Sequence, residues 1–130
     1  MSIFTKIINR EIPGHIVAED EHFIALLDSM PLVKGHTLII PKKEQEYIFD
    51  MDDVSLAAMN IFAKRVAIGL RKAVPCKRIG VTVIGLEVPH VHIHLIPMNT
   101  MGDINFSNPK LKPTQQELSE TTALIKQQLV

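Results

Sequence analysis

The segment from Pro89 to Pro97 constrains the fold of this chain most, because three histidines alternate in it with apolar residues. Side chains of a β-strand point alternately to its two faces, and every second residue advances about 6.6 Å. We therefore predict a strand over residues 88–96 that ends at Pro97. One face of this strand would carry His90, His92 and His94, and the other would carry the apolar Val91, Ile93 and Leu95 into the core.

Apolar periodicity elsewhere predicts three helices and four more strands. The expected helices are a short one over residues 3–9, a long one over 51–73 and a C-terminal one from Thr114 onward. The expected strands cover residues 16–18, 23–27, 35–41 and 79–84, and the first two of them form a hairpin. Because strands occur in runs, the fold class is predicted as α+β, with a mostly antiparallel five-stranded sheet. One domain spanning residues 1–130 is expected for a chain of this length.

Capping residues and proline mark the ends of the predicted helices. Asp50 is expected to cap the long helix, with Asp53 in its first turn, and Pro75 closes it. Thr114 followed by Glu117 has the spacing of a capping box and opens the last helix.

Composition excludes several classes of function. Fourteen basic residues balance fourteen acidic ones, so no overall field draws the protein to nucleic acid or to acidic lipid. Cys76 is the single cysteine, which excludes an internal disulfide and a cysteine cluster for zinc. Residues 1–13 have the character of neither a signal peptide nor a membrane span. We therefore expect a cytoplasmic protein with no nucleic-acid partner and no membrane partner.

The three alternating histidines are compatible with two kinds of chemistry. A His-x-His pair can hold a catalytic zinc ion together with a further ligand such as Glu87 or Asp28. Alternatively, a neutral imidazole can attack phosphorus and form a covalent intermediate, while its neighbours orient it or protonate the leaving group. The residues alone leave both alternatives open.

The pattern His90-Val-His92-Ile-His94-Leu-Ile resembles the signature of the histidine triad (HIT) superfamily. Three further segments resemble that superfamily's opening helix and central strands in the same order, namely residues 3–13, 27–31 and 35–42. The branch of small histidine triad nucleotide-binding proteins is the most similar. The resemblance covers about residues 3–97 and leaves a C-terminal loop and helix, residues 98–130, without a matching motif.

This resemblance implies a HIT-like fold and a hydrolase that needs no metal and no cofactor. The implied substrates are nucleoside 5′-phosphoramidates or related purine nucleotides, cleaved at the α-phosphorus through a covalent nucleotidyl-histidine to release AMP or GMP. His92 would be the nucleophile, and free imidazole, with a pKa of about 6.5, is largely neutral near pH 7. His94 would contact the phosphate and assist protonation of the leaving group. His90 and His36 would hold the ring and tautomer of His92 by hydrogen bonds.

The resemblance also implies a nucleotide pocket. Asp28 would accept hydrogen bonds from the ribose hydroxyls. The other implied nucleotide-binding residues, besides His92 and His94, are Ile3, Phe4, Ile7, Leu26, Ser29 and Glu87. For the apolar members of this set, simple core packing is an equal alternative.

Several positions depart from the family pattern. Ile84, Leu86 and Glu87 stand where members often carry an Asn and a Gly-Gln pair that hold phosphate, and leucine has no side-chain donor. Ser2 and Thr5 stand where some members have zinc-binding cysteines, so no structural zinc is expected. These departures support one alternative, a purine-nucleotide-binding or protein-interaction module without turnover. A dinucleoside polyphosphate hydrolase is a second alternative and a close variant of the implied hydrolase. The resemblance further implies a homodimer, with the long helix and central strands at its interface.

Overall fold

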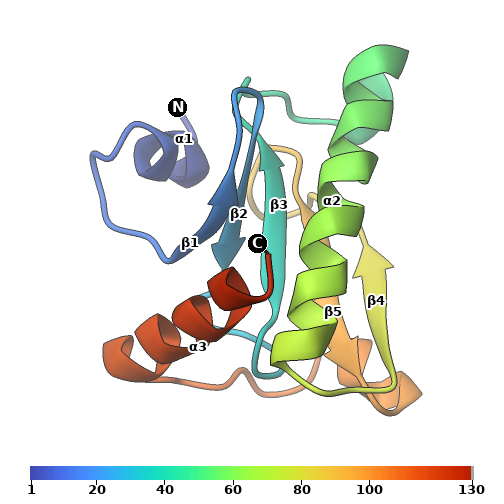
Figure 1. The fold of residues 1–130 in the computed structure, drawn as a ribbon. Helices are drawn as coiled ribbons and strands as arrows, with labels where there is room; N and C mark the ends of the chain where they lie inside the picture. The colour runs from blue at the N-terminus through green and yellow to red at the C-terminus, as the bar shows by residue number, and fades with distance from the viewer. Residues whose placement is uncertain (130) are drawn as a thin grey trace.

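The computed structural model describes residues 1–129, and its centre is a five-stranded sheet with helices on both faces (Figure 1). The strands are β1 (Ile16–Glu19), β2 (Phe23–Leu27), β3 (Thr37–Pro41), β4 (Arg78–Thr82) and β5 (Ile93–Met98). Their order in the sheet is β1-β2-β3-β5-β4, and every neighbouring pair is antiparallel. The helices are α1 (Ile3–Ile8), α2 (Asp53–Ala73) and α3 (Gln115–Gln127), with short 3₁₀ helices η1 (Ile48–Asp50) and η2 (Met101–Ile104). The predicted α+β class is confirmed.

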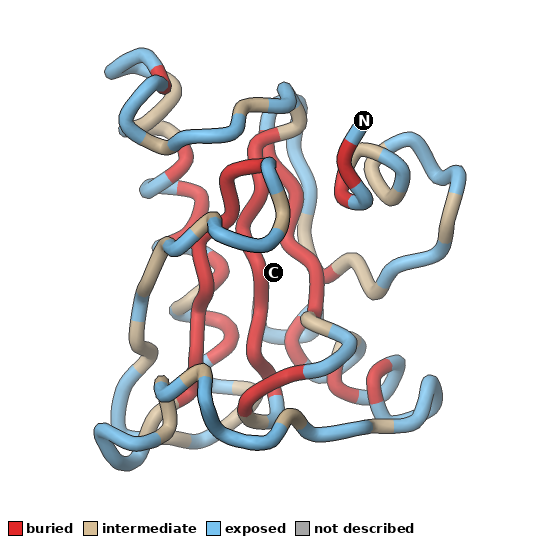
Figure 2. Tube along the Cα trace, turned by 180° about the vertical axis from the view of Figure 1, so that it is seen from behind, coloured by how far each residue is buried: buried red, intermediate tan, exposed pale blue. Residues whose placement is uncertain are grey.

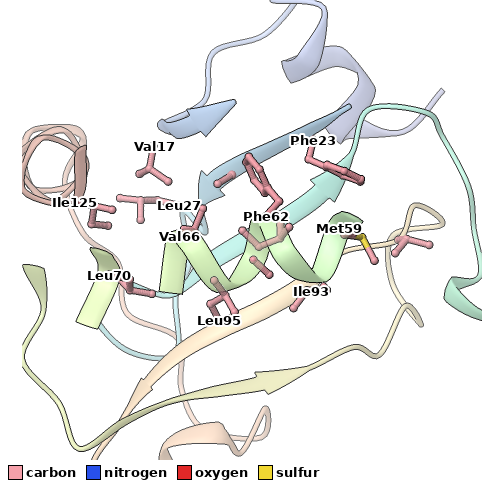
Figure 3. Close-up of a cluster of buried hydrophobic side chains, with 14 of the residues drawn as sticks. Val17, Phe23, Leu27, Met59, Phe62, Val66, Leu70, Ile93, Leu95 and Ile125 are labelled. Carbon is pink, nitrogen blue, oxygen red and sulfur yellow. The ribbon is translucent and has the colours of Figure 1, made fainter. Parts of the chain in front are cut away.

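The larger core lies between one face of the sheet and the helices α2 and α3 (Figure 3). Phe23 and Leu27 of β2 meet Phe62 and Val66 of α2, and the rings of Phe23 and Phe62 lie 5.8 Å apart. Ile125 of α3 closes the same cluster. Each such buried side chain stabilises the fold by about 1.5–3 kcal/mol.

The opposite face of the sheet is covered by α1 and by loops rather than by a long helix. Phe4 of α1 packs there against alternate residues of β2 and β3, which are Ile24, Leu26, Leu38 and Ile40. Seen from this side, the buried strands run through the centre and exposed loops cross their lower ends (Figure 2). His94 of β5 lies opposite Leu38 and therefore points to this face. This is the face on which the polar site can open.

β5 begins at Ile93, so the prediction of a strand from residue 88 is wrong. Gly85 has a φ of +75°, which takes the chain out of the extended conformation before the histidines. The N–H of His90 then donates to the carbonyl of Val88, and the N–H of Val91 donates to Gln45. These donors are used in turns and loop contacts, so the chain makes no strand ladder there. The predicted faces nevertheless hold, because Val91 joins Ile93 and Leu95 in the larger core and His92 lies beside His94.

Other predicted strand ends also differ from the structure. Pro97 lies inside β5 opposite Ile79, beyond the last β3–β5 pair, so a missing N–H is tolerated there. β3 starts at Thr37 rather than residue 35, because Gly35 has a φ of +88°. β4 spans residues 78–82 rather than 79–84.

The observed ends of the helices agree better with the predicted ones than the ends of the strands do. Asp52, and not Asp50, caps α2 by accepting a 2.8 Å hydrogen bond from the N–H of Ser55. Asp50 instead ends η1. The capping box of Thr114 and Glu117 and the β1–β2 hairpin are confirmed. Within the part of the chain that the structure describes, no helix is both long and apolar enough to cross a membrane.

Candidate active site

Asp28, His36 and His94 meet where three neighbouring strands begin or end. Asp28 follows β2, His36 precedes β3, and His94 lies in β5, which pairs with β3. The N–H of Asp28 donates to the carbonyl of His36 and extends the β2–β3 pairing by one step. One side-chain nitrogen or oxygen from each of the three residues lies within 4.8 Å of the others.

The ring of His36 links a backbone donor to His94. Leu32 donates its N–H to Nδ1 of His36 at 3.1 Å, so Nδ1 carries the lone pair and Nε2 carries the proton. Nε2–H of His36 then donates to Nδ1 of His94 at 2.9 Å. His94 must therefore carry its own proton on Nε2, where it is available as a donor. We call this chain of hydrogen bonds the Leu32–His36–His94 relay.

Both histidines of the relay stay neutral near pH 7. Burial lowers the pKa of His36 to about 4, and the nearby positive charge of Lys110 adds to the effect. Burial lowers the pKa of His94 to about 3, with contributions from His92, His36 and Lys110. His94 can thus donate a hydrogen bond at neutral pH without carrying a charge.

His92 has the opposite tautomer. Its Nδ1–H donates at 2.8 Å to the carbonyl oxygen of His90, which leaves the lone pair on Nε2. Its ring centroid lies 4.8 Å from that of His94. A nitrogen with a free lone pair and a neutral donor therefore come from neighbouring rings.

The ring of His90 makes its hydrogen bonds to Pro41 and Ser2. Its Nε2–H donates to the carbonyl of Pro41 at 2.7 Å, and its Nδ1 accepts from the hydroxyl of Ser2 at 2.6 Å. Ser2 also caps α1 by accepting the N–H of Thr5, and Thr5 donates its hydroxyl to Glu44. His90 therefore contacts His92 through its backbone carbonyl, and its ring fixes where that carbonyl lies.

The sequence-predicted nucleotide pocket is assembled only in part. Asp28 accepts the N–H of Met30, and burial raises the pKa of its carboxyl group. Phe4 lies edge-on to His92, with ring centroids 5.0 Å apart, and gives the site an apolar wall. Ser29 is exposed beside Asp28.

The remaining predicted residues lie in the core, at its edge or on the surface. Leu26 is buried in the cluster around Phe4, and Ile7 is half-buried against that cluster. Ile3 is 52% exposed, so it can contact a ligand only at the rim. Glu87 is exposed in the loop between β4 and β5, and its charge contributes to the raised pKa of Asp28.

The donor set of Asp28, His36 and His94 fits a hydrogen-bonded relay better than a metal site. A metal ion bound between the two facing ring nitrogens would need a lone pair on Nε2 of His36 and on Nδ1 of His94 at once. These two nitrogens instead lie 2.9 Å apart and share a proton. The hydroxyls of Ser2 and Thr5 are likewise engaged with His90 and Glu44.

Sequence reasoning missed two residues that lie at the site, Phe106 and Lys110. The ring of Phe106 lies 4.9 Å from that of His94 and 6.2 Å from that of His36. Nζ of Lys110 lies 5.3 Å from the centroid of Phe106 and donates to the carbonyl of that residue. Both belong to an irregular segment after η2 that has no periodicity, so no local pattern indicated these contacts.

Comparisons with known proteins cover the same residues. The family model described as HIT domain matches residues 9–101, which include Asp28, His36 and the three histidines of the triad. An uncharacterized HIT-like protein of Methanocaldococcus jannaschii is 44% identical over 108 residues, which is 75% of this chain and 78% of that protein. The adenosine 5′-monophosphoramidase of Saccharomyces cerevisiae is 39% identical over 100 residues, covering 73% of this chain and 61% of the yeast protein.

Solved structures show the same fold. A hypothetical histidine triad nucleotide-binding protein from Sulfolobus tokodaii has a TM-score of 0.83 and 31% identity, over 97% of this chain and 90% of its own. A zinc-bound histidine triad family protein from Mycobacterium smegmatis has a TM-score of 0.84 and 25% identity, over 98% of this chain and 91% of its own. The similarity therefore extends through the C-terminal segment that carries Phe106 and Lys110.

Proposed function

This chain belongs to the HIT family, and from that premise we propose that it is a nucleotidyl hydrolase whose nucleophile is His92. Its substrates would be nucleoside 5′-phosphoramidates or related purine nucleotides, and its products AMP or GMP. The similarity to the yeast phosphoramidase supports this substrate class.

The observation that carries the proposal is the pair of complementary tautomers on His92 and His94. Nε2 of His92 would attack the α-phosphorus as the P–N bond of the phosphoramidate breaks, and the leaving amine takes a proton from the solvent. His94 would donate its Nε2–H to a phosphate oxygen or to the leaving nitrogen, and so stabilise developing charge. Water then attacks phosphorus, the bond to His92 breaks, and the nucleoside monophosphate leaves while the surplus proton returns to solvent.

Two residues would bind the nucleoside part of the substrate. One oxygen of the Asp28 carboxylate accepts a hydrogen bond from the N–H of Met30. The other oxygen would accept hydrogen bonds from the ribose hydroxyls. Phe4 would present an apolar edge beside His92, with Ile3, Ile7 and Ser29 at the rim. A planar purine suits such a partly apolar wall.

One observation favours a second candidate, a nucleotide-binding module with little turnover. Ile84 is 45% exposed and Leu86 is 88% exposed in the loop that precedes the histidines. Neither side chain can donate to a phosphate, so this loop would supply only backbone N–H groups. A dinucleoside polyphosphate hydrolase would use the same attack with a nucleotide as leaving group.

We also propose that the protein is a homodimer. Val54, Ile61 and Ile68 form an exposed apolar stripe along α2, spaced two helical turns apart. Val81 is 61% exposed on β4, which is an edge strand of the sheet. An apolar helix stripe next to an unpaired strand edge is typical of a surface that a second copy covers.

Phosphorus-31 NMR of the protein with adenosine 5′-phosphoramidate and EDTA tests the proposed hydrolysis. We expect AMP from the wild type and none from His92→Asn, whereas His22→Asn, which alters an exposed histidine, should retain full activity. A broadened nucleotide signal without AMP would favour the binding module. Loss of activity with EDTA would contradict metal-free catalysis. Release of a second nucleotide from a dinucleoside polyphosphate, without cleavage of the phosphoramidate, would favour a dinucleoside polyphosphate hydrolase.

A further inference from the structure

The segment that follows η2 is held against the site by hydrogen bonds at both of its ends. Asn108 donates its side-chain N–H to the carbonyl of Gly102, and Ser107 donates its N–H to the side chain of Asn105. Farther along, the N–H of Leu111 donates to the carbonyl of Pro31, in the loop that precedes β3. Phe106 therefore lies against His94 and His36 as part of an ordered loop.

Lys110 is positioned by Phe106. Its Nζ donates at 2.7 Å to the carbonyl of Phe106 and lies 5.3 Å from the centroid of that ring. The ring in turn lies 4.9 Å from the ring of His94. An aromatic face attracts a cation and limits the rotamers of its side chain. The ammonium group is thereby kept beside the relay.

The ammonium group of Lys110 has N–H donors that are available to a ligand. An ammonium carries three N–H donors, and one of them is used by Phe106. Lys42 and Arg10 each pair with Glu19, but among residues 1–129 no carboxylate lies within ion-pair distance of Lys110. Lys110 is half-buried, so its charge is less well hydrated than that of a fully exposed lysine.

The two histidines of the relay add no positive charge for a phosphate. His36 and His94 are neutral near pH 7, because burial lowers the pKa of each. The carboxylates of Asp28 and Glu87 are negative and would repel a phosphate. Lys110 lies beside these groups through Phe106, whose ring is 4.9 Å from that of His94 and 6.2 Å from that of His36.

We propose that Lys110 binds the α-phosphate of the nucleotide, with its free N–H groups on a non-bridging oxygen and with Phe106 as its support. This inference rests on the proposed function, because it assigns one more group to the same site. It identifies the cation that offsets the charge of Asp28 and Glu87 when an anionic substrate binds. Phosphate recognition would then come from the C-terminal segment and would not need side-chain donors from the loop at Ile84 and Leu86.

Calorimetric titration with AMP and with adenosine tests this assignment, because the two ligands differ only in the phosphate. We expect Lys110→Met to weaken AMP binding about tenfold or more and to leave adenosine binding within about twofold. Lys110→Arg should restore much of the AMP affinity, and raising the salt concentration should reduce the difference between Lys110→Met and the wild type. The matched control is Lys126→Met, which removes an exposed lysine from the last turn of α3 and should bind both ligands like the wild type. Lys110→Gln provides a second neutral variant should the methionine variant fold poorly.

The outcomes separate this inference from the proposed function. Equal weakening of AMP and adenosine, or no weakening of either, would overturn the role of Lys110. A selective loss of AMP affinity in a protein that hydrolyses no phosphoramidate would support Lys110 and contradict the hydrolase. If the wild type hydrolyses the phosphoramidate and Lys110→Met keeps the wild-type AMP affinity and KM, the hydrolase is supported and the role of Lys110 is contradicted. A wild type that binds neither ligand would overturn both.

Discussion

The hydroxyl oxygen of Ser2 lies 2.6 Å from Nδ1 of His90, although 88 positions separate the two residues in the sequence. Ser2 is at the same time the N-cap of α1, and its backbone N–H donates to Glu44. The ring of His90 is held between Ser2 and the carbonyl of Pro41, and the carbonyl of His90 receives Nδ1–H of His92. The second residue of the chain therefore helps to orient the proposed nucleophile.

Replacing Ser2 by alanine should slow turnover and destabilise the fold. The change leaves Nδ1 of the fully buried His90 without a donor and removes the cap of α1, which together should lower the free energy of unfolding by about 2 kcal/mol. We expect kcat for adenosine 5′-phosphoramidate to fall about tenfold with little change in KM. Urea denaturation and steady-state kinetics measure the two effects.

Two comparisons complete that experiment. Ser119→Ala removes an exposed hydroxyl from α3 and should change neither quantity, while Ser2→Thr keeps a hydroxyl and should recover part of the activity. A Ser2→Ala protein with wild-type kcat would show that the position of His90 does not depend on Ser2.

The hydrogen bonds predict the tautomer of each buried histidine in the free protein. His92 should be protonated at Nδ1, because it donates to the carbonyl of His90. His36, His90 and His94 should be protonated at Nε2. Two-bond nitrogen–proton NMR spectra of protein labelled with ¹⁵N-histidine distinguish the two forms near pH 7. A Nδ1–H signal from His94 would contradict the relay.

Acidification should destabilise the protein through His36 and His94. Both bind a proton near pH 6.5 when unfolded, but the pKa in the folded state is about 4 for His36 and about 3 for His94. Below pH 6.5 the unfolded chain therefore binds more protons, and the free energy of unfolding falls as pH decreases. The stabilisation should be complete above pH 6.5 and lost progressively toward pH 4 and 3.

Thermal melts of the wild type and of His36→Leu between pH 7.5 and 4.5 measure this dependence. The variant loses the contribution of His36, so its melting temperature should fall less steeply as the pH decreases. Burial raises the pKa of Asp28, so this residue makes the free energy of unfolding rise as the pH decreases. Asp28 is present in both proteins, so its effect largely cancels when their melting temperatures are compared. Parallel curves for the two proteins would show that His36 does not titrate as described.

A charge in the apolar stripe of α2 should dissociate the proposed dimer. Ile61 is 59% exposed at the centre of the stripe, so Ile61→Glu should fold normally and sediment as a monomer at micromolar concentration, unlike the wild type. Met30→Glu places the same charge on an exposed methionine of the β2–β3 loop and should remain dimeric. A monomeric wild type would overturn the assignment of this face.

Elements that rest on local patterns were predicted well from the sequence. The capping box of Thr114 and Glu117 and the long helix follow from residue types a few positions apart, and both occur in the structure. The cap of that helix was misplaced by two residues, because Asp50 and Asp52 are equally good cap residues and the turn of η1 decides between them.

Alternation of polar and apolar residues predicted the faces of the side chains at the site but not the start of the strand. It assigned His90 and His92 to a strand, but Gly85 and the hydrogen bond between His90 and Val88 turn the chain before β5 begins. Phe106 and Lys110 could not be predicted at all, since their place depends on contacts with Pro31 and His94 that no nearby residue indicates.

The partners that fix the tautomers of His36 and His92 are main-chain atoms, the N–H of Leu32 and the carbonyl of His90. Almost any amino acid can supply such an atom, so the side chains at position 32 and around the loop can change over evolution without altering where these protons reside. What selection must preserve is the path of the backbone. Position 2 is the exception, because its contribution to His90 comes from a hydroxyl group that few residue types can replace.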